Sequence, residues 1–148
     1  MKQLIITIVL ICLWGSCTND ELCEGVGTNE IKLSFKNYES GSALSITLDS
    51  IGFSWKPLMD TLYLDTTVTF IGLPVDPDTS VTQFVFVTAD RTDTLEIGYH
   101  VSSSLISAEC GPELLFSQLD TIYHTFDSLA IIQNIFDREV ETNIELFY

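Results

Sequence analysis

Alternation of apolar and polar residues with a period of two is the feature that most constrains how this chain can fold. The alternating stretches are residues 31–35, 44–48, 95–101 and 144–148. The pattern is typical of β-strands with one buried face, because successive side chains point to opposite faces of a sheet. Helical periodicity is nearly absent, and only residues 113–119 suggest a helical turn. We therefore predict an all-β fold, an immunoglobulin-like antiparallel β-sandwich of seven to nine short strands.

Two apolar stretches depart from simple alternation. Residues 81–88 carry Phe84 and Phe86 on one face and valines on the other, so this strand is either covered on both sides or presents its aromatic rings to a partner. Residues 51–55 continue the preceding alternation with the phase slipped by one at residues 49–50, which predicts a bulge or a tight turn. The aromatic residues Phe53, Trp55, Phe84 and Phe86 are the predicted partner surface.

The first 16 residues have the layout of a secretory signal. A short positive start, which contains Lys2, precedes an apolar run at residues 4–13 and then small residues. Ten apolar residues are too few to cross a membrane as a helix, which takes about 20. The alternative is a buried N-terminal helix or strand of the folded domain.

Gly15 and Ser16 directly precede Cys17, and this arrangement resembles the lipobox of bacterial lipoproteins. The resemblance implies cleavage before Cys17, a diacylglycerol on its thiol and an acyl chain on the new amine. Several acyl chains hold a protein on a membrane almost permanently. The acidic residues 20–21 after Cys17 are similar to an export tag of some surface lipoproteins, although acidic residues are also common in any solvated tether.

Two cysteines remain for the folded part of the chain. Cys12 lies in the signal and Cys17 takes the lipid, which leaves Cys23 and Cys110. In an oxidising compartment such a pair predicts a disulfide. It would close a loop of about 88 residues, worth about 4–5 kcal/mol in the chain-entropy model. A zinc site needs more ligands at close spacing, and a redox pair is expected as Cys-x-x-Cys.

The charge of the chain excludes one class of partner. The sequence has 21 acidic against 6 basic residues and a formal net charge of −15. A surface of this kind repels phosphate backbones, so we exclude nucleic-acid binding, and docking on anionic lipid headgroups is equally disfavoured.

Residues that could support chemistry are few. His100 and His124 are the only histidines, and no nucleophile-elbow or phosphate-binding motif accompanies them, so we predict no enzymatic activity and no cofactor. Asp76 and Asp78 could offer oxygen ligands to calcium, but the intervening Pro77 equally suits a plain turn, and we predict no metal site.

The chain resembles a family of small bacterial lipoproteins whose function is not established. The resemblance rests on Cys23, on residues 31–35 and 93–99, on the Glu-Cys-Gly element that ends at Gly111, and on the C-terminal residues 125–129 and 143–148. It implies a lipid-anchored domain with a cysteine pair, and it transfers no catalytic residue.

These observations predict a signal peptide at residues 1–16, a lipidated tether at residues 17–29 and a β-sandwich at residues 30–148. The expected product is an outer-membrane lipoprotein that faces the periplasm or the cell surface and acts as a non-catalytic binding or assembly module, with an envelope protein as its partner. The alternative is a calcium- or carbohydrate-binding surface protein.

Overall fold

The chain forms nine β-strands in a computed structural model, which describes residue 25 and residues 27–53, 60–107 and 110–148, with the backbone alone for residues 60–64. The strands are β1 (Glu30–Lys36), β2 (Ile46–Phe53), β3 (Asp60–Val68), β4 (Phe70–Pro74), β5 (Val81–Val87), β6 (Thr92–Ser107), β7 (Gly111–His124), β8 (Ser128–Ile131) and β9 (Ile144–Phe147). The described residues include no helix.

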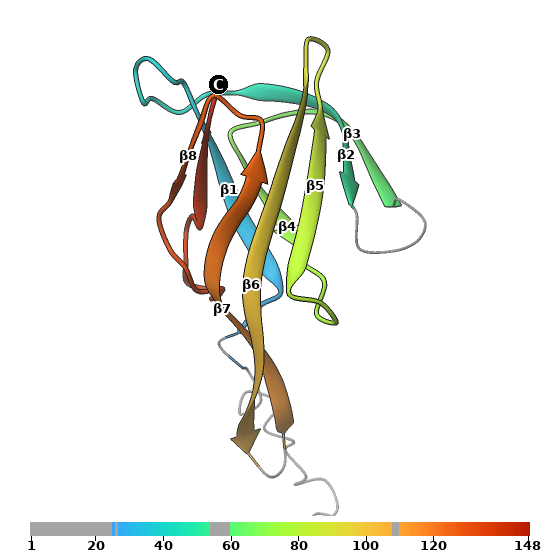
Figure 1. Cartoon of the computed structure of the whole chain (residues 1–148), viewed down its shortest axis with the longest axis vertical. Coiled ribbons are helices and arrows are strands. Elements are labelled where there is room, and N and C mark those ends of the chain that lie inside the picture. The colour runs from blue at the N-terminus through green and yellow to red at the C-terminus, as the bar shows by residue number, and fades with distance from the viewer. Residues whose placement is uncertain (1–24, 26, 54–59, 108–109) are drawn as a thin grey trace, which may run out of the picture.

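Two sheets pack face to face and confirm the predicted β-sandwich (Figure 1). One sheet has the strand order β4-β1-β9-β8 and the other β3-β2-β5-β6-β7. Most pairs are antiparallel, but β1 and β9 pair in parallel, with Leu33 opposite Ile144. The helical turn predicted at residues 113–119 is wrong, because this segment belongs to β7 and pairs with β6 along its length.

Local predictions from the alternation are confirmed. β5 and β6 form the antiparallel hairpin expected from their flanking turn, with Phe84 opposite Leu95. The phase slip before Ile51 corresponds to a register shift between Leu48 and Ser50 in the β2–β3 pair. The extra residue of this bulge lies on β3, where Asp65 has a φ of 40°. Both halves of β2 bury their apolar residues.

Aromatic rings fill the space between the sheets. Phe84 and Phe86 are 0% exposed and Phe53 is 6% exposed. Phe84 contacts Phe53 edge to face with ring centroids 5.7 Å apart, and Phe86 contacts Phe126 at 5.6 Å. The predicted partner surface is therefore wrong for these three rings, which belong to the core. Trp55, the fourth residue of that prediction, lies outside the described residues.

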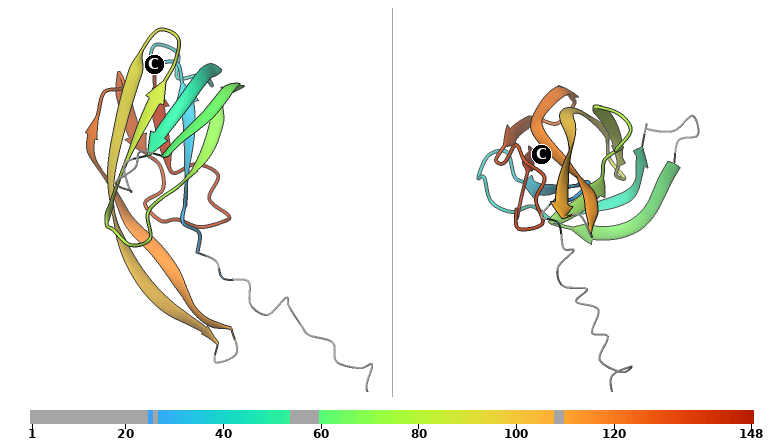
Figure 2. Two further views of the ribbon diagram at one scale, coloured as in Figure 1. Left: turned by 90° about the vertical axis from the view of Figure 1, so that its right-hand side faces the viewer. Right: turned by 90° about the horizontal axis from the view of Figure 1, so that it is seen from below.

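A long hairpin arm projects from one end of the sandwich (Figures 1 and 2). We define the arm as residues 100–107 of β6 together with residues 110–117. Pairing between β5 and β6 ends at Gly98, so beyond that point β6 is paired with β7 alone among the described strands. At about 3.3 Å per residue, this ribbon is about 25 Å long.

The loop between β8 and β9 closes part of the outer edge of β7. The Phe136 N–H donates to the Phe116 carbonyl at 3.0 Å, and the Leu119 N–H donates to the Asn134 carbonyl at 3.1 Å. This loop is held in turn by the buried side chain of Asn143, which bonds to β1 and to the loop backbone. The body end of the arm is thus fixed by a segment close to the C-terminus.

Candidate functional site

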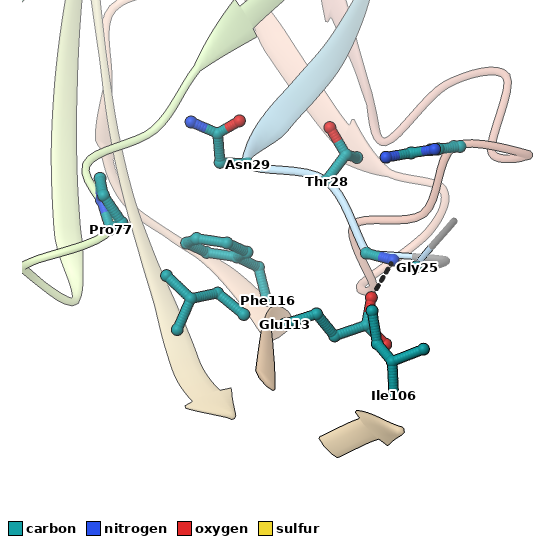
Figure 3. Close-up of a pocket in the computed structure, with 10 residues that line it drawn as sticks. Gly25, Thr28, Asn29, Pro77, Ile106, Glu113 and Phe116 are labelled. Carbon is teal, nitrogen blue, oxygen red and sulfur yellow. Dashed lines mark hydrogen bonds between the residues drawn. The ribbon is translucent and has the colours of Figure 1, made fainter. Parts of the chain in front are cut away.

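The candidate site is an open groove at the foot of the arm, with a volume of about 470 Å³ (Figure 3). One wall is the segment that leads into β1, and the other is the arm itself. The lining residues are Gly25, Gly27, Thr28, Asn29, Pro77, Ile106, Glu113, Leu114, Phe116 and Arg138. We call Gly25 and residues 27–29 the N-terminal segment.

The N-terminal segment is held against β7 by a close backbone approach. The Gly27 N–H donates to the Glu113 carboxylate at 3.3 Å. A Cβ at Gly27 would lie 2.6 Å from the Leu114 carbonyl oxygen, and a Cβ at Gly25 would overlap the Glu113 carboxylate. The Glu113 side chain could move away from a Cβ at Gly25, but the Leu114 backbone could not do so at Gly27, so glycine at position 27 is what lets this segment reach the arm.

The groove combines an apolar floor with opposite charges. Phe116 is buried and packs against Tyr99 and Phe136, with ring centroids 5.9 and 5.7 Å apart. Arg138 is exposed, and its carbonyl accepts a hydrogen bond from the Lys32 ammonium at 2.8 Å. A floor of this kind with one carboxylate and one guanidinium at its rim suits binding of a polypeptide segment, since apolar contact gives affinity and sparse polar groups fix orientation.

Of the three cysteines that were predicted to carry a lipid or form a disulfide, the structure describes one. Cys110 is disulfide-bonded and stands directly before β7, at the far end of the arm. Its N–H donates to the Ser107 hydroxyl at 3.0 Å, which closes the end of the hairpin. Cys17 and Cys23 lie outside the described residues, so the lipid site and the Cys23–Cys110 pairing stay predictions.

The two histidines are far apart along the sheet. His100 is exposed and lies opposite Ser117 on β7, whereas His124 lies at the other end of β7, opposite Leu95. The Nδ1 atom of His124 is buried and has no hydrogen-bond partner among the described residues. The fold therefore does not bring the histidines into one constellation.

In the acidic turn considered for calcium, a carboxylate is engaged by the backbone of the turn itself. The Asp78 N–H donates to an Asp76 carboxylate oxygen at 2.9 Å, which is an Asx turn. Within the described ranges, no group of three or more His, Cys, Asp or Glu side chains is placed to hold a metal ion. No helix in the same ranges is long and apolar enough to cross a membrane.

A polar cluster lies at the end of the sandwich opposite the arm. Asp93 is 1% exposed and accepts hydrogen bonds from Arg91 at 2.7 Å and from the Thr125 hydroxyl at 3.0 Å. The hydrogen bond that the Arg91 guanidinium donates to Asp93 raises the pKa of Arg91. Burial, followed by the nearby Asp93 charge, raises the pKa of the Tyr148 phenol well above its ordinary value. The guanidinium also lies over the Tyr148 ring, 5.1 Å from its centroid, so the cluster is a structural ion pair.

Sequence reasoning missed the residues that build the groove. Glu113, Leu114 and Phe116 fall in the predicted helical turn, and the pair Gly25 and Gly27 falls in the predicted tether. The glycine pair that begins two residues after Cys23 is the signal that could have pointed to a close backbone approach.

Comparison with known proteins gives one match. The profile of a family of unknown function, DUF6452, matches residues 47–148. This range includes the Glu-Cys-Gly element and the C-terminal stretches on which the family resemblance rests, but it excludes Cys23 and β1. No curated protein and no solved structure matches the chain.

Proposed function

Because the chain belongs to the DUF6452 family of unknown function, we propose a role from its own residues. The protein is a lipid-anchored component of the bacterial outer membrane that binds an envelope protein without catalysis. Residues 1–16 are its signal peptide, Cys17 carries the lipid, and Cys23 pairs with Cys110. The disulfide at Cys110 supports a location outside the cytosol, since such bonds persist in oxidising compartments.

The proposed binding role rests on one observation, the groove at the foot of the arm. It is open, it has an apolar floor, and the N-terminal segment forms one of its walls. A partner segment seated there would be held close to the membrane by the same lipid. The Glu113 carboxylate already accepts a backbone hydrogen bond, so its part in this site is to hold the wall of the groove.

Two measurements test this function. Intact mass of the mature protein from cell envelopes should show a chain that begins at Cys17 and carries acyl chains, and a Cys17→Ala variant should lose both. Lipidation fails as a proposal if the purified wild-type chain has an unmodified N-terminus.

Photo-crosslinking in living cells tests the groove. A benzoylphenylalanine at exposed Arg138 should give a discrete adduct with one envelope protein. The matched control is Tyr38, which is exposed on the β1–β2 loop at the opposite end of the sandwich. Adducts at neither position, or the same adducts at both, would remove the groove as a binding site.

A further inference from the structure

The face of β6 that forms the core continues along the arm, where the described residues leave its far part exposed. Within the body this face carries Leu95 and Ile97, both 0% exposed beneath the second sheet. On the arm the same alternation reaches Leu105, which is 66% exposed. Across the ribbon, Leu114 lies opposite Ser103 and is 46% exposed, and Pro112 lies opposite Leu105. The arm thus has an apolar inner face that runs from Leu114, which also lines the groove, to Leu105 near the free end.

Charged residues on the arm are few. Among the described residues of the arm, Glu113 is the only Asp, Glu, Lys or Arg, although the chain as a whole carries a formal charge of −15. Glu113 is engaged by the Gly27 N–H. With Glu109 between its two strands and Glu113 engaged, the arm carries little charge for an acidic protein, and its inner face is suited to a neutral apolar medium rather than to an anionic surface.

Chain length fixes where the arm can lie. If Cys23 pairs with Cys110, the tether leaves the domain at the end of the arm. Only five residues then lie between the lipid-bearing Cys17 and Cys23, and the six Cα–Cα steps span at most roughly 20 Å when fully extended. The end of the arm cannot leave the neighbourhood of the membrane surface that holds the lipid.

We propose that the inner face of the arm, through Leu105 and Leu114, rests in the interfacial layer of the membrane in which the protein is anchored. This inference depends on the lipid anchor and the disulfide of the proposed function. A protein partner is disfavoured as the occupant, because two leucines and a proline offer far less than the ~800 Å² per partner of a stable interface. The sequence places the charged Glu109 between β6 and β7, which favours an arm that lies on the interface over one that pierces it.

Tryptophan quenching by brominated phosphatidylcholine tests this placement. The lipidated protein is reconstituted into vesicles of that lipid as a Leu105→Trp or a Leu114→Trp variant. We expect a blue shift and a loss of emission from both, after subtraction of the wild-type signal of Trp55. The matched control is Tyr38→Trp, at an exposed site at the other end of the sandwich, which should show neither change. Addition of Leu105→Asp to the Leu114→Trp variant should abolish the quenching.

A second form of the protein separates failure of the arm from failure of the anchor. Residues 18–148 carry an N-terminal hexahistidine tag and are tethered to the same vesicles through a nickel-chelating lipid. If the mass measurement shows an unmodified Cys17, the natural lipid anchor is disproved. Quenching in the tagged form still decides whether the arm reaches lipid. Quenching at Leu105→Trp no greater than at Tyr38→Trp in either form overturns the proposal. The proposal is also overturned if the indole introduced by Leu105→Trp is protected from aqueous acrylamide but is not quenched by the lipid. Protein would then cover the arm.

Discussion

Replacement of Asn143 by alanine should destabilise the domain by an amount that can be worked from its hydrogen bonds. The side chain is 1% exposed. Its Oδ1 accepts from the Lys32 N–H at 2.9 Å, and its Nδ2 donates to the Ile135 carbonyl at 2.7 Å and to the Gln133 carbonyl at 3.3 Å. At a net ~1 kcal/mol for each bond, the three together contribute about 3 kcal/mol. Domains of this size are stable by only ~5–15 kcal/mol, so the loss is large.

Urea denaturation followed by far-UV circular dichroism measures this change, and the midpoint should fall at an unchanged slope. The matched control is Asn134→Ala in the same loop, where the side chain is exposed and the cost should stay within about 0.5 kcal/mol. In the Asn143 variant the Phe136 amide should also exchange faster, because its bond to the Phe116 carbonyl depends on the position of the loop. A loss below about 1 kcal/mol, or equal losses for both asparagines, would refute the assigned role of the side chain.

Three further predictions follow from single contacts. Gly27→Ala should loosen the N-terminal segment and lower the free energy of unfolding by about 1–3 kcal/mol, as read by proteolysis and urea midpoint. Gly98→Ala, whose Cβ would make ordinary van der Waals contacts with Ile122 at 3.4 Å and the Ser80 carbonyl at 3.9 Å, should lower it by less than about 0.5 kcal/mol. Equal losses would contradict the close approach. Tyr99→Phe should lower the free energy of unfolding by about 2 kcal/mol, because the hydroxyl donates to the carbonyl of the β4–β5 turn at 2.7 Å and shares a second hydrogen bond with Thr82. An unchanged thermal midpoint would contradict this prediction. The phenol of Tyr148 has a raised pKa in the folded state, so its contribution is complete below about pH 10, where the unfolded phenol titrates, and is lost as pH rises further. Tyr148→Phe should therefore flatten the alkaline fall in stability, and identical alkaline slopes for variant and wild type would disprove it.

The strands with a single buried face were predictable from the sequence because their period directly reflects burial. β1 and β9 alternate strictly, and the core takes every apolar member of each alternating set. The irregularity in the β2–β3 pair was also predictable, since both halves of a phase-slipped strand can face the core only if regular pairing is interrupted. These features depend on residues close in sequence, and no knowledge of distant partners is needed.

The orientation of β5 was not predictable, because both of its faces are apolar. The register decides it: Phe53 lies opposite Phe84 and Ile51 opposite Phe86, so these large side chains share one face and fill the gap between the sheets. The smaller Val85 then takes the outer face. This choice depends on pairing between strands about 30 residues apart, which local alternation does not encode.

The character of β7 was missed for a similar reason. Residues 113–119 place leucine and phenylalanine at spacings that a helix could also bury. Pairing with β6 overrides that local preference, and the backbone of β7 is irregular at one point. Gln118 has a φ of 55°, at the register shift between Gly98 and His100 of the partner strand. A bulge there keeps Phe116 and Leu119 both buried, which an unbroken strand would not do.

The arm could not persist as an isolated ribbon, and what supports it explains why the site lies at its foot. A two-stranded hairpin is marginal in water unless other elements pack on it. Here the loop after β8 bonds to the body end of the arm, the N-terminal segment covers residues 113–115, and a disulfide holds Cys110 at the free end. One of these supports, the N-terminal segment, leads directly into β1 and so joins the start of that strand to the arm. If Cys17 is the anchor and Cys23 pairs with Cys110, as we propose, the tether ends on this same arm, which then lies nearest the membrane.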